Sequence, residues 1–70
     1  MTNINASMAG SVWKILVSKG DKVNAGQDVV ILESMKMEIP IAAEQDGVVK
    51  DVLVQEGGFI NEGETLIELE

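Results

Sequence analysis

One lysine near the middle of the chain has a methionine on each side, in the stretch ESMKMEI of residues 33–39. Once deprotonated, the primary amine of Lys36 can attack an activated acyl group. Met35 and Met37 are unbranched and polarizable, so they can adapt to more than one partner surface. Two-residue hairpin turns favour Asn-Gly or other glycine-containing pairs, so ease of turning does not explain a Met-Lys pair here.

The composition leaves little other chemistry to the chain. It contains no cysteine and no histidine, which excludes thiolate nucleophiles, disulfides, Cys-ligated metals and the side chain best suited to proton transfer near neutral pH. Glu33 and Glu38 could in principle form a catalytic carboxylate pair, but neither a histidine nor a nucleophile accompanies them. We therefore expect a protein that is not an enzyme.

The charge balance restricts the partners. Twelve acidic residues against five basic ones give a net charge of −7, which repels nucleic acids and anionic membranes and suits basic protein partners. The chain has neither a signal-peptide pattern nor an apolar run long enough to span a membrane, so we expect a cytoplasmic location. Its 70 residues predict one domain, residues 1–70, which we expect to be a monomer in isolation.

An internal repeat organises the sequence. Residues 10–33 align without a gap on residues 47–70, at an offset of 37 positions. Two equal halves imply a pseudo-twofold axis. The identities fall at nine pairs: Gly10/Gly47, Val12/Val49, Leu16/Leu53, Val17/Val54, Gly20/Gly57, Asn24/Asn61, Gly26/Gly63, Leu32/Leu69 and Glu33/Glu70.

Each half offers about four short extended segments. They are rich in β-branched residues and separated by glycine-containing turns, with one brief extended step at Val23 or Ile60. The glycines lack the strand-to-helix setting and the Gly-Lys-Ser/Thr ending of a phosphate loop, so we interpret them as turn residues. The pattern predicts an all-β sandwich or barrel. The longer expected strands are residues 2–7, 12–17, 28–33, 37–43, 48–54 and 65–70.

A short helix competes for the central stretch. Leu32, Met35, Lys36 and Ile39 match the i, i+3, i+4, i+7 spacing of a helix that would end before Pro40. The repeat argues against it, because the equivalent segment of the second half is strand-like. We favour a strand, a tip at Met35-Lys36 and a second strand.

The residues ESMKMEIPI, preceded by GQDVVIL and followed by GVVKDVLVQEGG, resemble the biotinyl domain of biotin-dependent carboxylases, from about Ile4 to Glu70. The resemblance implies a flattened β-barrel of two four-stranded antiparallel sheets with quasi-twofold symmetry. It implies that Lys36 is the biotin attachment residue, flanked by Met35 and Met37, with Glu33 recognised by the ligase. Ser34 replaces the alanine usual in the family. Residues 6–10, an expected N-terminal hairpin, lack the prolines common there.

The family further implies a carrier function. Biotin on Lys36 would carry a carboxyl group between a biotin carboxylase and a carboxyltransferase, after a biotin protein ligase has attached it. Two alternatives stay open: a lipoyl carrier or dually modified protein bearing lipoate on the same lysine, and a binding module without a cofactor. Trp13 stands where the second half has Lys50, and an exposed partner contact or a core position would fit it equally well.

Overall fold

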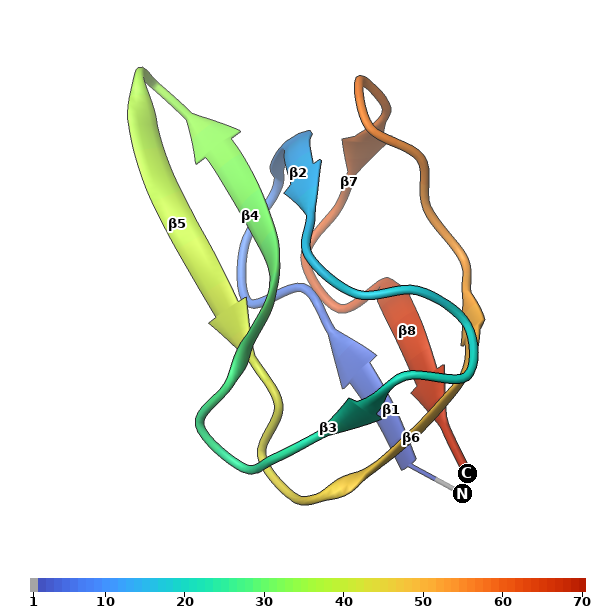
Figure 1. Cartoon of the computed structure of the whole chain (residues 1–70). Coiled ribbons are helices and arrows are strands. Elements are labelled where there is room, and N and C mark those ends of the chain that lie inside the picture. Colours follow the sequence, from blue (N-terminus) through green and yellow to red (C-terminus); the bar gives the residue numbers. More distant parts are fainter. Residues whose placement is uncertain (1) are drawn as a thin grey trace.

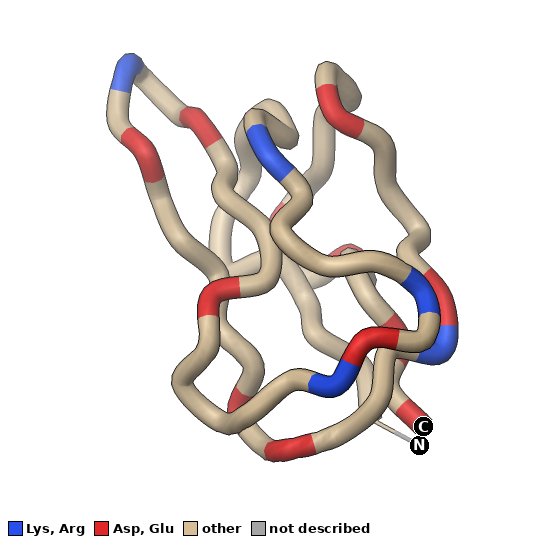
Figure 2. Tube along the Cα trace, in the orientation of Figure 1, with Lys and Arg blue, Asp and Glu red and all other residues tan. Residues whose placement is uncertain are grey.

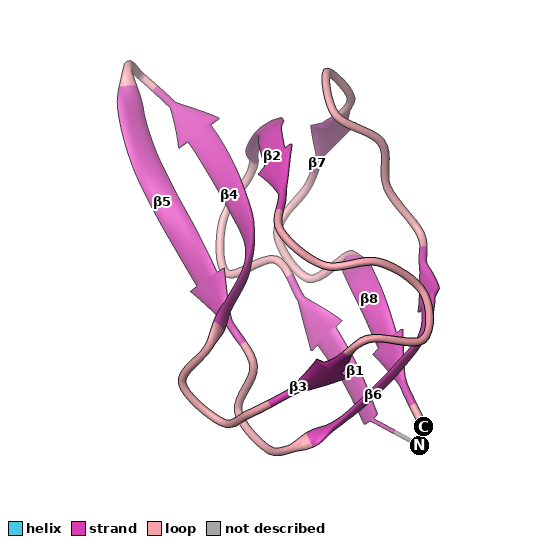
Figure 3. Cartoon of the chain, viewed as in Figure 1, coloured by secondary structure: helices cyan, strands magenta, loops and turns pink. Residues whose placement is uncertain are grey.

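The computed structural model describes residues 2–70, which form eight β-strands and no helix (Figures 1 and 3). No segment of this part of the chain is a helix that could cross a bilayer. The strands are β1 (Thr2–Asn5), β2 (Gly10–Ile15), β3 (Lys22–Val23), β4 (Asp28–Ser34), β5 (Met37–Ala42), β6 (Gly47–Val52), β7 (Phe59–Ile60) and β8 (Thr65–Leu69).

The strands form two four-stranded antiparallel sheets, in the orders β5-β4-β2-β7 and β1-β8-β6-β3. A shift of 37 residues carries β2, β3 and β4 onto β6, β7 and β8, and carries β1 onto β5. The predicted all-β fold and its quasi-twofold symmetry are confirmed. Each half also lends two strands to the other half's sheet, since β5 and β7 pair with β4 and β2, while β1 and β3 pair with β8 and β6.

The core lies between the sheets and is entirely apolar among the described residues. Strand side chains alternate between the faces of a sheet, so Val12 of β2 and Leu32 of β4 point inward while Ser11 and Glu33 point to solvent. Burial of these side chains is the main stabilisation available to so small a chain. The core comprises Ile4, Ala6, Val12, Val17, Val23, Val29, Val30, Leu32, Ile41, Ala43, Val49, Ile60, Leu66, Ile67 and Leu69.

Two equivalent β-bulges interrupt this alternation. Along β2, Val12 pairs with Leu32 but Lys14 pairs with Ile31, so Trp13 is an extra residue. Along β6 the same shift lies between Val49 and Asp51 and leaves Lys50 as the extra residue. A bulge re-aims the side chains next to it. Trp13 is 42 % exposed, so it is not a core residue.

Two turns, each with a glycine at positive φ, directly precede β4 and β8. Gly26 has φ +87° and Gly63 has φ +86°, a backbone region that favours glycine. The Gly26 amide donates to the Ala43 carbonyl at 2.8 Å, and the Gly63 amide donates to the Ala6 carbonyl at 2.9 Å. The repeat therefore reproduces hydrogen bonds as well as strands.

Two details differ from the sequence-based expectations. The N-terminal hairpin expected at residues 6–10 is wrong, because β1 and β2 belong to different sheets and this segment crosses between them. The alternative helix at Leu32–Ile39 is also wrong, since β4 and β5 pair throughout this region. Thr2 of β1 pairs with Leu69 of β8, and this end of the molecule lies away from the β4–β5 turn (Figure 1).

Candidate functional site

The β4–β5 hairpin places Met35 and Lys36 at a two-residue tip. The strands pair from Asp28 and Ala42 up to Ser34 and Met37. Both tip residues have positive φ, 52° for Met35 and 66° for Lys36, and they are the only non-glycine residues among the described ones to do so. This geometry is normally supplied by Asn-Gly, and each non-glycine residue held in it costs about 1 kcal/mol or more. The tip residues are therefore not the ones that would stabilise the turn best.

Replacing the pair should expose that cost. We expect Met35→Asn/Lys36→Gly to raise the free energy of unfolding by about 1 to 2 kcal/mol, because Asn-Gly adopts positive φ with little strain. Thermal and urea unfolding of the unmodified proteins measure the change. A melting temperature equal to or below that of the parent would contradict the strained-turn interpretation.

The tip is the most exposed part of the site. Met35 is 91 % exposed and Met37 is 58 % exposed, and Lys36 between them is exposed as well. Figure 2 shows this lysine as a blue cap on a hairpin that projects from the body of the molecule. The other four lysines lie on strands or turns of the body: Lys14, Lys19, Lys22 and Lys50. The structure thus sets one amine apart from the rest.

Two glutamates flank the tip on the same face of the sheet. Glu33 of β4 and Glu38 of β5 are direct cross-strand partners, and both are exposed. Like charges at directly opposed positions destabilise a sheet, by an amount of up to about 1 kcal/mol. The pair gives one face of the hairpin a negative charge next to the tip, and Figure 2 shows one acidic position on each strand of the hairpin near its blue end.

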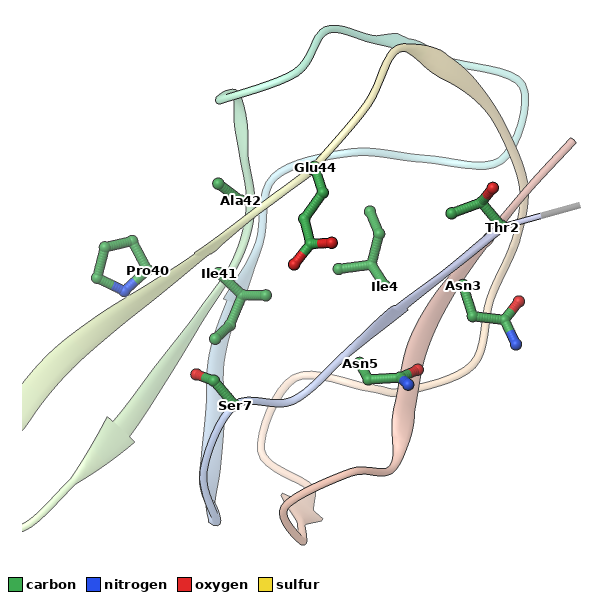
Figure 4. A pocket seen from close by; sticks show the side chains of 9 residues that line it. All are labelled: Thr2, Asn3, Ile4, Asn5, Ser7, Pro40, Ile41, Ala42 and Glu44. Atoms are coloured by element: carbon green, nitrogen blue, oxygen red, sulfur yellow. The ribbon is translucent and has the colours of Figure 1, made fainter.

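A hollow lies toward the end of the hairpin away from the tip. It encloses about 320 Å³ between the edge strand β1 and the last residues of β5, and Glu44 is its one charged residue (Figure 4). Without a second titratable group it has no pair for acid–base catalysis. Covalent attachment to a lysine needs an accessible amine and no pocket, and Lys36 meets that requirement. The hollow is lined by Thr2, Asn3, Ile4, Asn5, Ser7, Pro40, Ile41, Ala42 and Glu44.

Comparison with known proteins identifies the family. A family model described as biotin-requiring enzyme, the biotin/lipoyl family, matches residues 2–69. The chain belongs to this biotin/lipoyl family. The resemblance seen in the sequence is thereby confirmed over nearly its whole length.

Two relatives show the settings in which the biotin/lipoyl family occurs. The chain is 54 % identical over 66 residues to the biotin/lipoyl attachment protein of Bacillus subtilis, covering 94 % of this chain and 90 % of that protein. It is 41 % identical over 66 residues to the alpha3 subunit of a biotin-dependent acyl-coenzyme A carboxylase of Mycobacterium leprae, covering 94 % of this chain but 11 % of that subunit. The family fold thus occurs both in a small protein and as a minor part of a large one.

A solved structure extends the fold to lipoyl domains. The lipoyl domain of the 2-oxoglutarate dehydrogenase complex of Azotobacter vinelandii superposes with a TM-score of 0.81 at 26 % identity, covering all of this chain and 96 % of that one. The shared architecture supports the two-sheet barrel. At this identity the fold by itself does not distinguish a biotin carrier from a lipoyl carrier.

Proposed function

We propose that this protein is a non-catalytic carrier of covalently bound biotin, attached to Nζ of Lys36. The observation that carries the proposal is the placement of one lysine, out of five, at a projecting tip with positive φ on both residues. A turn kept at a cost in stability is typical of functional sites. Membership of the biotin/lipoyl family indicates what kind of group the lysine would carry.

The chain contributes position and recognition to this function. A lysine amine in water is almost entirely protonated at neutral pH, so the modifying ligase has to deprotonate it and supply an activated acyl group. The rigid hairpin presents the amine where a ligase can reach it, while Met35 and Met37 supply adaptable apolar surface around it. We assign Glu33, three residues before the lysine, to ligase recognition.

The proposed partners after modification are a biotin carboxylase and a carboxyltransferase in the cytoplasm. Lys36 would hold the biotin, which would supply the group that carries a carboxyl between the two enzymes. A covalent arm keeps the cofactor at a high effective concentration near both sites, which free biotin would not achieve. The acidic surface of the carrier, with net charge −7, favours basic contact regions on these enzymes.

A lipoyl carrier is the second candidate. It is supported by the similarity to the dehydrogenase lipoyl domain and by the name of the Bacillus relative, a biotin/lipoyl attachment protein. The Met-Lys-Met tip favours biotin, because the resemblance to biotinyl domains rests on that tripeptide. Dual modification would combine the two.

The mass of the native protein tests the proposal. We expect intact mass spectrometry to find one added biotinyl group per chain, streptavidin to retain the protein, and peptide mapping to place the group on Lys36. A lipoyl mass increment without streptavidin binding would replace the proposal by the second candidate. Unmodified protein, in cells where other carrier proteins are biotinylated, would favour a binding module without a cofactor.

Charge reversal at Glu33 tests its recognition role. We expect Glu33→Lys to slow biotinylation at least about tenfold, because a basic ligase surface would then meet a like charge. The fold should not suffer, since a lysine opposite Glu38 replaces a like-charge pair by an attractive one.

The symmetry of the fold provides the control for this variant. Glu70, directly after β8 of the other sheet, is the repeat equivalent of Glu33 and is also exposed, so Glu70→Lys changes the net charge equally. We expect this variant to be biotinylated like the parent. Equal rates for Glu33→Lys and the parent would refute the recognition role.

A further inference from the structure

The pseudo-twofold axis allows each position on one sheet to be compared with its equivalent on the other. Equivalent positions share strand, pairing and bulge, so they share nearly the same structural demands. A consistent difference in side-chain type between them therefore needs a cause other than folding. Such a difference runs over the outer faces of the two sheets.

The outer face of the sheet β5-β4-β2-β7 is apolar where its equivalent is polar. On this face Lys14 pairs with Ile31, and Ile31 pairs with Pro40, while Ser11 pairs with Phe59. Five positions of this face carry an apolar side chain where the equivalent face carries a polar one: Trp13 for Lys50, Ile31 for Glu68, Pro40 for Asn3, Ala42 for Asn5 and Phe59 for Lys22. One position runs the other way, with Ser11 on this face and Val48 on the other. The apolar side chains are thus concentrated on the sheet that carries Lys36.

Trp13 and Phe59 are the large exposed side chains of this face. Trp13 stands on the bulge of β2, with Nζ of the neighbouring Lys14 5.0 Å from its ring centroid, and Phe59 on the adjacent β7 is 67 % exposed. Exposure of an aromatic side chain to water is unfavourable, and aromatic side chains are enriched at protein contact sites. The equivalent bulge is occupied by a lysine, so the backbone does not require an aromatic residue there.

The charges near the tip on the same face indicate the partner. Glu33 and Glu38 lie there, directly opposite each other, while Lys14 beside Trp13 adds one positive charge farther from the tip. With a net charge of −7, a second copy of this chain would be repelled, whereas a surface with arginine or lysine beside an apolar recess would gain from both features.

We propose that this outer face, with Trp13 as its anchor, is the surface on which the biotin protein ligase docks. The inference rests on the function proposed above. The ligase is favoured over the carboxylase because its reacting atom lies closer to the hairpin. During attachment the reacting amine is at the end of a single lysine side chain, so the enzyme has to cover the flanks of the hairpin. After attachment the cofactor's own chain separates the hairpin from the next active site, and such close contact is no longer required.

The fold supplies an exchange variant that keeps the composition constant. Trp13→Lys puts on the first bulge the residue found on the second, and Lys50→Trp does the reverse. The double variant keeps the amino-acid content and the net charge of −7 while moving the tryptophan to the other sheet. Phe59→Lys is a second probe of the same face, since the equivalent strand carries Lys22.

The test is the steady-state rate of biotinylation by a purified bacterial biotin protein ligase at varied carrier concentration. We expect the KM for the carrier to rise about tenfold or more in Trp13→Lys and in the double variant, with kcat within about twofold of the parent, because a buried tryptophan anchor dominates binding. Lys50→Trp alone should match the parent. Phe59→Lys should raise KM in the same direction, and it decides the question if Trp13→Lys does not fold.

Other outcomes have definite meanings. Parent-like KM values for Trp13→Lys and Phe59→Lys would overturn the docking surface. Normal biotinylation of the variants combined with slower carboxyl transfer by the carboxylase would assign the face to that enzyme. A dimer of the parent that Trp13→Lys abolishes would assign the face to a second copy of the chain. Either result overturns the proposal. If the parent itself is not biotinylated, the proposed function fails before the docking surface is tested.

The contact of Trp13 with the ligase can be measured directly in a binding experiment. Trp13 is the only tryptophan of the chain, so 5-fluorotryptophan gives the carrier one fluorine signal. We expect this signal to shift and broaden when ligase is added to the Lys36→Arg carrier, which cannot turn over. An unchanged signal at ligase concentrations that saturate binding would overturn the role of Trp13.

Discussion

Lys36→Arg should abolish biotin incorporation while leaving the fold intact. Arginine keeps the positive charge, but its guanidinium stays protonated and cannot act as the acyl acceptor. The side chain is exposed at a hairpin tip and contributes little packing, so the melting temperature should stay close to that of the unmodified parent. Streptavidin blotting after co-expression with a biotin protein ligase, together with intact mass, measures the loss.

The parent provides an internal charge control for this experiment. Amide formation removes one positive charge, so the modified parent should be one unit more negative than −7 and should elute later from an anion exchanger. The Lys36→Arg protein should show only the early peak. Persistent label on this variant, mapped to Lys14, Lys19, Lys22 or Lys50, would contradict the assignment of the attachment site.

The repeat explains why the fold could be predicted from the sequence. Paired glycines such as Gly26 and Gly63, at a constant offset, mark turns that only a few conformations satisfy. The alternating apolar residues between them then define strands and their buried faces. The helix that periodicity allowed at Lys36 failed because the pairing of β4 with β5 satisfies more backbone hydrogen bonds than one helical turn would.

Other features depend on contacts that the sequence does not encode locally. The exchange of β3 and β7 between the sheets places residues of one half against the other half, and no local pattern specifies it. The crossing of residues 6–10 between sheets, first interpreted as a hairpin, has the same origin. Strict alternation from Val12 would have turned Lys14 inward, but the bulge turns it outward. The sequence left Trp13 open between a partner contact and a core position, and the strand pairing shows which apolar side chains share its outer face.

The functional site, like the fold, could be predicted from the sequence only in part. The Met-Lys-Met tripeptide was evident in the sequence, and the poor fit of Met35-Lys36 to a tight turn already suggested a function. The positive φ of Met35 and Lys36 gives that suggestion a physical basis, because the backbone is strained where the lysine lies at the tip. The structure places Glu33 directly opposite Glu38, which is the register that a two-residue tip at Met35-Lys36 sets.

Valine at the two equivalent glycine turns should destabilise the protein severely. Nothing lies within 4 Å of a Cβ added at Gly26 or at Gly63, so the cost arises from positive φ alone. A β-branched residue in this backbone region costs about 1 to 3 kcal/mol. Against a total stability of roughly 4 to 10 kcal/mol for a chain of this size, the double variant Gly26→Val/Gly63→Val should lose about 2 to 6 kcal/mol, which is a large part of its stability.

A graded series separates backbone strain from other effects of these substitutions. Asparagine tolerates positive φ better than valine, so Gly26→Asn should retain most of the stability that Gly26→Val loses. The two turns are equivalent and independent, so the single valine variants should show similar losses that add in the double variant. Urea unfolding followed by circular dichroism measures all five proteins. Equal midpoints for Gly26→Asn and Gly26→Val would mean that φ is not the cause, and a parent-like midpoint for Gly63→Val would show that the symmetry of the fold does not extend to its energetics.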